Sequence, residues 1–171
     1  MKNTMIIASL LVLFMTIGFA LSDDIPFGAN EKQVKQFFSD EGYTFKGIDR
    51  IEGLLFVGGT EFETPSHIFA NIAPDSGLKE VVITLFTEDY EAISKYRSIR
   101  LTMIGKYGKP TDDFELFTYP YKAGDGYEEQ AISEKKCYLD CFWTNSITGE
   151  KYSSAILSTN TDLTVQIIYA K

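Results

Sequence analysis

Apolar and polar positions alternate with a helical period from Thr87 to Pro110, the longest such stretch after the N-terminus. The apolar positions recur at steps of three and four residues: Ala92, Tyr96, Ile99, Met103 and Tyr107. This spacing predicts an amphipathic helix that lies on an apolar surface. Thr87 suits the N-cap, with Glu88 and Asp89 in the first turn, and Gly108 suits the C-terminal stop.

A shorter helix is predicted from Asn30 to about Gly42. Asn30 and Gln33 have the spacing of a capping box, in which each side chain bonds the other residue's backbone N–H. Val34, Phe37 and Phe38 form one apolar face. A helix of about three turns needs tertiary packing to persist.

Elsewhere the hydrophobic period is two, which is typical of strands. The strand candidates are 43–48 (the weakest), 51–57, 61–70, 78–86, 114–119, 135–144, 152–158 and 163–169. Gly58-Gly59 and the segment 74–77 have the composition of turns between them. In the last candidate, Leu163, Val165, Ile167 and Tyr169 share one face.

This order of elements predicts an α+β fold. We expect two helix-plus-antiparallel-strand repeats that form one sheet, with both helices packed on one face. The halves are about 23–87 and 88–171, within a single domain over 21–171. Arg97 and Arg100 fall inside or beside the apolar arc of the middle helix. We expect their stems to lie along the apolar surface and their charges to reach water or an acidic neighbour.

Residues 1–20 have the composition of a secretory signal peptide. Lys2 precedes an apolar run from Met5 to Phe19, and small residues stand where cleavage after Ala20 requires them, with Ala20-Leu21-Ser22 as a second possible site. The run is shorter than the ~20 residues of a membrane span. We therefore expect an exported protein, periplasmic or secreted, that is soluble and not stably inserted in a membrane. No cysteine lies near the cleavage point, which disfavours a lipid anchor.

Composition narrows the classes of partner. The chain of 171 residues is 44% hydrophobic and 14% aromatic, which suffices for a packed core, and its formal charge is −8. An acidic surface repels phosphate backbones, so we expect no nucleic-acid partner.

Three segments carry a family resemblance: IPFGANEKQVKQFFSDEGY (25–43), the middle helix ending in KYGKP (96–110), and V-x-I-x-Y (165–169). With them the chain resembles uncharacterised exported α+β proteins of gut bacteria. These in turn resemble the paired α/β repeats of the beta-lactamase-inhibitor-like fold. The resemblance supports the predicted architecture, and it implies no activity because a shared fold does not confer function.

Cys137 and Cys141 are the only cysteines, and an even number in an exported protein invites a disulfide. On a straight strand, however, four residues span about 13 Å, beyond the roughly 7 Å Cα separation that a disulfide allows. We therefore favour two buried thiols over a bridge, which would need a bulge near Asp140. A C-x3-C pair without a second half does not indicate a metal site.

The most informative loop is 119–129, with the sequence YPYKAGDGYEE. It combines tyrosines, which are frequent in contact surfaces, with glycines and a proline. We select Tyr119, Tyr121, Asp125 and Tyr127 as candidate binding residues. The alternative is an ordinary long loop whose tyrosines fold back on the sheet edge.

The leading hypothesis is an exported, non-enzymatic binding module for a protein or glycan, without a cofactor or metal. No nucleophile–base, metal or phosphate motif appears in the sequence. The first alternative is a hydrolase that uses His67, the lone histidine, with a carboxylate. The second is a structural envelope protein without a specific ligand.

Overall fold

The computed structural model describes residues 25–49, 53–88, 90–144, 154–159 and 162–171. The predicted signal peptide and Asp89 lie outside these ranges. Within them, one antiparallel sheet of eight strands and three helices make up an α+β fold, as predicted. The described residues include no helix that is both long and apolar enough to cross a membrane.

The elements follow the predicted order, with one additional helix. The helices are α1 (Glu31–Asp40), α2 (Ala92–Tyr107) and α3 (Glu128–Ser133). The strands are β1 (Thr44–Asp49), β2 (Gly53–Glu61), β3 (Thr64–Ala73), β4 (Gly77–Leu85), β5 (Asp112–Phe117), β6 (Cys137–Thr144), β7 (Ser154–Thr159) and β8 (Val165–Ala170). α3 was not predicted, because its six residues are too few to show a helical period.

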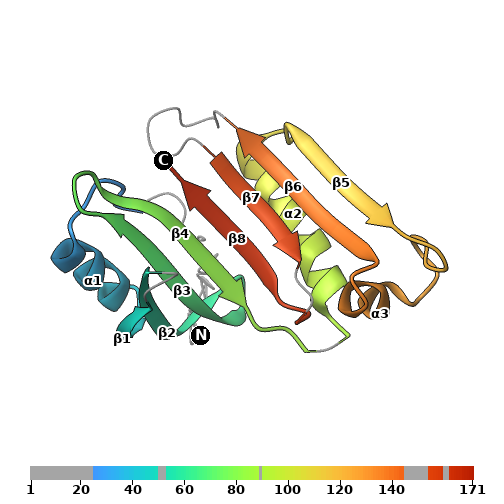
Figure 1. Cartoon of the computed structure of the whole chain (residues 1–171), viewed down its shortest axis with the longest axis horizontal. Coiled ribbons are helices and arrows are strands. Elements are labelled where there is room, and N and C mark those ends of the chain that lie inside the picture. The colour runs from blue at the N-terminus through green and yellow to red at the C-terminus, as the bar shows by residue number, and fades with distance from the viewer. Residues whose placement is uncertain (1–24, 50–52, 89, 145–153, 160–161) are drawn as a thin grey trace, which may run out of the picture.

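The strand order across the sheet is β1-β2-β3-β4-β8-β7-β6-β5. β4, the last strand before α2, pairs with β8, the last strand, in the middle of the sheet. Their pairing runs from Glu80 opposite Ala170 to Leu85 opposite Val165. β1 and β5 are consequently the two edge strands (Figure 1).

The register places the buried strand residues on a common face of the sheet. Phe56, Ile68, Ile83 and Ile167 stand opposite one another on β2, β3, β4 and β8, and each is at most 1% exposed. Burying a side chain of this size stabilises the fold by about 1.5–3 kcal/mol. We call this face the core face and its reverse the open face.

The helices add to the same core cluster. From α1, the Phe38 ring lies 4.8 Å from the Phe56 ring. α2 lies against β7 and β8 and passes behind the strands in Figure 1. At the C-terminal end of α2, the Gly108 carbonyl accepts a hydrogen bond from the indole N–H of Trp143 on β6, 2.9 Å away.

The N-terminus of α1 is as predicted. The Asn30 side chain accepts a hydrogen bond from the Gln33 backbone N–H at 3.1 Å, and the Gln33 side chain accepts one from the Asn30 N–H at 3.0 Å. Val34 and Phe38 are fully buried. This reciprocal capping box satisfies two N–H groups that a helix end otherwise leaves free.

The predicted start of the middle helix was wrong. α2 begins at Ala92, and Glu91 holds the N-cap position without a side-chain hydrogen bond. The Thr87 hydroxyl instead donates to the Leu163 carbonyl at 2.6 Å, which ties the approach to α2 to the approach to β8. The predicted stop was right, since Gly108 follows the helix with φ of +77°.

The turn predicted at Gly58-Gly59 was also wrong. Both glycines lie inside β2, next to an irregularity in its pairing with β3. The chain turns instead at Phe62 and Glu63, which both have positive φ. Gly59 is needed for space, because a Cβ there would come within 2.2 Å of the buried Tyr43 ring. The glycine therefore reports a close packing contact and not a turn.

Candidate binding surface

An apolar row crosses the open face of the sheet. The register aligns one residue from each of five strands in this row: Leu55, Phe69, Val82, Ile168 and Phe142. β7 places Ile156 at the same register, between Ile168 and Phe142. All five described side chains are half-buried. Aligned apolar residues on one face of a sheet form the kind of surface that partners bind.

The row continues into a more exposed apolar patch on β5 and β6. Phe114, Leu116 and Tyr138 are 42%, 57% and 55% exposed. Leu116 stands opposite Tyr138, and Phe114 packs edge-on against Phe142 with ring centroids 6.0 Å apart. These are three of the large apolar side chains that the fold leaves in solvent, and all three face the same way.

A carboxylate stands in the middle of this patch. Asp140 is directly opposite Phe114 on β5 and Ser158 on β7, and its neighbours along the same face of β6 are Tyr138 and Phe142. It is half-buried, and the described residues offer it no recorded hydrogen bond or cation. Desolvation by these neighbours raises the pKa of Asp140. We call Phe114, Leu116, Tyr138, Asp140 and Phe142 the Asp140 patch.

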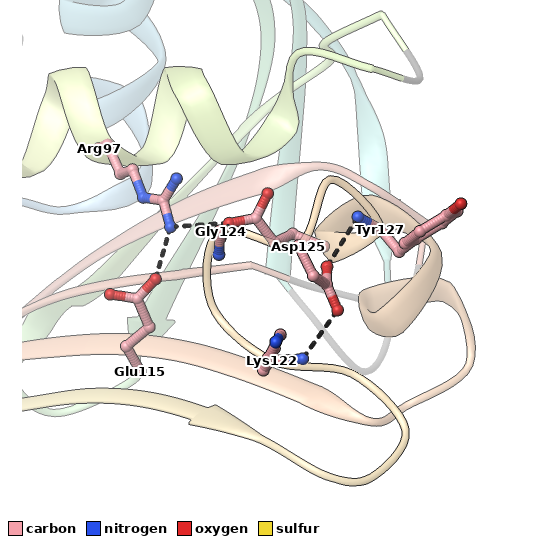
Figure 2. A network of polar contacts seen from close by, with 7 residues as sticks. Arg97, Glu115, Lys122, Gly124, Asp125 and Tyr127 are labelled. Atoms are coloured by element: carbon pink, nitrogen blue, oxygen red, sulfur yellow. Dashed lines mark hydrogen bonds and ion pairs between the residues drawn. The ribbon is translucent and has the colours of Figure 1, made fainter.

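The 119–129 loop is held by its own polar groups (Figure 2). The Asp125 carboxylate accepts hydrogen bonds from the backbone N–H of Lys122 at 2.9 Å and of Tyr127 at 2.8 Å. These two bonds lower the pKa of Asp125. The Gly124 N–H donates to Glu128 at 2.9 Å. Asp125 thus fixes the shape of the loop, as aspartate commonly does in turns.

Arginine contacts join this loop to α2 and β5. Arg97 donates to Glu115 at 2.5 Å and to Glu128 at 3.2 Å (Figure 2). Arg100 pairs with Asp113 on β5. The expectation that these arginines reach acidic neighbours is confirmed. Such half-exposed pairs each contribute about 0–1 kcal/mol and serve mainly to orient the strand and the loop.

The three loop tyrosines differ in their exposure to solvent. Tyr119 is 90% exposed and Tyr127 is 61% exposed. Tyr121 is half-buried against the core and lies near the Lys136 ammonium, 5.5 Å from its ring centroid. Its hydroxyl also bonds Glu134, whose pKa falls to about 2 because Gln130, Tyr121 and Lys136 all bond it. Tyr119 and Tyr127 are therefore the two that a partner can reach.

Cys137 and Cys141 lie on the core face of β6, where both are buried and free. They alternate with Leu139 and Trp143 in the buried row that the sequence pattern predicts. Burial raises the pKa of each thiol to about 11. Neither is an accessible nucleophile at neutral pH, since the reactive form is the thiolate.

His67 lies on the open face of β3, opposite Val57 and Thr84. Its ring packs edge-on against Phe86 with centroids 4.6 Å apart. Among the described residues, Phe86 is the side chain that contacts His67, and neither Val57 nor Thr84 is a carboxylate. The described ranges also contain no group of three or more His, Cys, Asp or Glu residues placed to hold a metal ion.

The Asp140 patch was not selected from the sequence. The alternation in 135–144 that predicts a buried row of cysteines also assigns Tyr138, Asp140 and Phe142 to the other face. Whether these three residues share a surface with other apolar side chains depends on which strand pairs with β6 and in which register. β5 precedes β6 in the chain, and the 119–129 loop and α3 lie between the two strands, so spacing alone could not reveal the patch.

In comparisons with known proteins, the chain matched no protein-family model, no curated protein and no solved structure.

Proposed function

We propose that this chain is an exported, non-enzymatic binding module that contacts a protein or glycan through the open face of its sheet and the 119–129 loop. The observation that carries the proposal is the apolar row on the open face, which ends at the exposed Asp140 patch. Export rests on the signal-peptide pattern of residues 1–20. Proteins rarely leave a contiguous apolar surface in water without a partner for it.

The polar framework of the 119–129 loop supports a contact role. The carboxylates of Asp125 and Glu128 accept hydrogen bonds from its backbone, while Tyr119 and Tyr127 project into solvent. A tyrosine on a fixed backbone offers apolar area and a polar tip with little loss of conformational entropy on binding.

A hydrolase that uses His67 is the weaker alternative. General-base catalysis requires a carboxylate or hydroxyl positioned to orient or use the imidazole. The contact recorded for His67 is the apolar ring of Phe86. The two cysteines that could act as nucleophiles are buried on the opposite face of the sheet. A structural envelope protein differs from the proposal only in lacking a specific ligand.

The proposal is tested with the loop tyrosines. The chain over residues 21–171, immobilised, is exposed to exported proteins and to arrayed glycans, and each retained ligand is then tested against Tyr119→Ala/Tyr127→Ala. We expect a loss of affinity of about tenfold or more, because exposed aromatic residues dominate contact energies. Thermal unfolding of the variant should change little, since neither side chain is buried.

Tyr90→Ala provides the matched control. Tyr90 is 75% exposed, and it belongs neither to the 119–129 loop nor to a strand of the sheet, because it precedes α2. A second variant, Val82→Lys, places a charge in the middle of the apolar row. A ligand whose affinity survives both test variants does not use this surface, and retention of no ligand at all would favour the purely structural role.

We further propose that the two halves of the chain are structural repeats with their helices on one face. Each half runs from a helix to a set of four strands, and the sheet order is symmetric about the β4–β8 pair. Phe56, which α1 contacts, and Trp143, which α2 contacts, are both buried on the core face. This layout supports the resemblance to paired α/β repeats drawn from the sequence.

A further inference from the structure

The two edges of the sheet are protected to different degrees. β1 carries Lys46 and an irregularity between Phe45 and Gly47, and the Lys35 ammonium of α1 lies 3.8 Å from the Phe45 ring centroid. A charge, a bulge and a covering side chain are the devices with which proteins block strand addition. The edge at β1 is therefore poorly suited to pair with another chain.

β5 has neither a bulge nor a lysine, although three of its six residues are carboxylates and two of these, Asp113 and Glu115, pair with arginines of α2. Its sequence DDFELF contains no lysine, proline or glycine, and every residue but Phe117 is exposed. Its pairing with β6 is regular over all six residues. A hollow of about 430 Å³ lies beside the start of β5. Its lining includes Asp112, Asp113 and Phe114 of the strand and two cations, Arg100 and Lys109. Among the described strands β5 pairs with β6 alone, so its outer backbone edge is open.

A second copy of this chain is a poor occupant of that edge. Symmetric antiparallel self-pairing centred on Asp113, Phe114 or Glu115 sets two carboxylates opposite each other, whereas pairing centred on Leu116 sets Glu115 opposite Phe117. Like charges directly opposite each other destabilise a strand pair. The net charge of −8 adds to this repulsion. Arg100 and Arg97 offset Asp113 and Glu115 on the core face. On the open face, Asp112 and Asp140 have no ion pair among the described residues, so this side of β5 favours a basic side chain.

The open face beside β5 supplies the complementary groups. Phe114 and Leu116 offer apolar contacts to side chains of an added strand, and Asp140 lies behind Phe114 without a recorded cation. Neighbouring strands are about 4.8 Å apart, so a residue opposite Phe114 on an added strand lies about 10 Å from the Asp140 backbone. A lysine or arginine side chain spans most of this distance, across the Phe114 ring and between Asp112 and Asp140.

We propose that β5 is a strand-addition site for an extended peptide segment of a partner protein that carries a lysine or arginine between two apolar residues at alternate positions. Backbone hydrogen bonds to β5 supply affinity, and the Asp140 patch reads the alternating side chains. The inference rests on the proposed binding function and specifies its partner class at this end of the open face.

The test uses the chain over residues 21–171 and a heptapeptide with a fluorophore on its N-terminus, fluorescein-Thr-Val-Thr-Arg-Thr-Val-Thr-amide, together with a glutamate peptide in which Glu replaces Arg. Fluorescence anisotropy measures both dissociation constants at pH 7. We expect the arginine peptide to bind saturably and about tenfold or more tighter than the glutamate peptide, because the patch presents a carboxylate and no cation. Equal affinity for the two peptides, or no binding, overturns the inference.

Matched variants locate the contact. Asp140→Asn and Phe114→Ser should each weaken the arginine peptide about fivefold or more. Asp75→Asn and Phe86→Ser should leave its affinity unchanged; Phe86 is 42% exposed, the same as Phe114, but lies next to His67. Unchanged affinity in both test variants rejects the site.

Backbone amide shifts in nuclear magnetic resonance spectra of the wild-type chain give an independent reading, since they need no variant to fold. We expect the arginine peptide to shift amides of residues 112–117 and not those of β1. Shifts confined to β1, or shifts at β5 with a neutral oligosaccharide but not with the peptide, contradict the inference. A ligand that Tyr119→Ala/Tyr127→Ala releases would still support the proposed function in that case.

Discussion

Two buried tyrosines place their hydroxyl groups in opposite situations. The Tyr43 hydroxyl shares a hydrogen bond with Ser66 at 2.7 Å and donates to Glu61 at 3.3 Å, all within the core. The Tyr96 hydroxyl, on α2, is buried with no hydrogen-bond partner among the described residues. Burial raises the pKa of both phenols. The difference decides what each hydroxyl contributes to stability.

We predict that Tyr43→Phe lowers the free energy of unfolding by about 1–2 kcal/mol, because it leaves Ser66 and Glu61 without this partner. Tyr96→Phe should be neutral or stabilising, since it removes a polar atom that the core does not satisfy. Urea unfolding at pH 7 measures both. The two variants lose the same atom, so an equal loss of stability would contradict the assignment of their hydrogen bonds.

The ionisation of Asp140 should oppose folding. Its pKa is raised in the folded chain by desolvation, so the folded state holds its proton more tightly than the unfolded state does. The penalty is absent below the ordinary aspartate pKa of about 4 and grows as pH rises through the folded-state value. The titratable groups near Asp140 are Asp112 and Tyr138 on the open face, and Asp113 of β5 with Tyr96 and Arg100 of α2 on the core face.

We therefore predict that Asp140→Asn raises the free energy of unfolding at pH 7 and that the gain disappears near pH 3. Urea unfolding across this pH range measures it, with Asp75→Asn as the control, because Asp75 is exposed. A variant that is less stable than the wild type at pH 7 would show that Asp140 has a stabilising partner in the folded chain.

At the scale of single elements, the sequence predicts strands and capped helix ends well where local chemistry decides them. The capping box of α1 and the alternating burial of β6 and β8 follow from residues a few positions apart. The turn at Gly58-Gly59 and the start of α2 failed because distant residues decide them. Tyr43 requires a glycine at position 59, and Leu163 engages the hydroxyl of Thr87. The Asp140 patch could not be predicted from local sequence either, since the register of β5 against β6 creates it.

The alternation of buried and more exposed side chains along β6 can be tested through the reactivity of its two cysteines. Cys137 and Cys141 are 4% and 0% exposed, and burial raises each thiol pKa to about 11 from an ordinary value of 9.0. We predict that, in protein purified without reductant, the native thiols react with a disulfide reagent at pH 8 at least about a hundredfold more slowly than in denaturant. Two thiols per chain should then react in denaturant.

The count of thiols separates the alternatives for β6. A bridge between Cys137 and Cys141 would give no reactive thiol even in denaturant until a reductant is added. Fast reaction in the native state would place at least one cysteine on the open face, which would shift the register of β6 by one residue.

At the scale of the whole molecule, the β4–β8 ladder makes the two halves depend on each other. It spans six residue pairs in the middle of the sheet, and Ile83 and Ile167, which face each other across it, are at most 1% exposed. Separating the halves would expose this row and leave two long, apolar strand edges unpaired. Each half alone would retain only part of one hydrophobic core.

We predict that fragments 23–87 and 88–171, produced separately, show no cooperative unfolding, and that they form a 1:1 complex with a native-like circular dichroism spectrum when refolded together. Ile83→Asp should prevent assembly because it buries an unpaired charge in the ladder. Glu80→Gln, at the half-buried end of the β4–β8 ladder, is the control that should still assemble. Cooperative unfolding of either fragment alone would mean that the repeats are independent domains, and the open face would then be two surfaces joined by one strand pair rather than one continuous sheet.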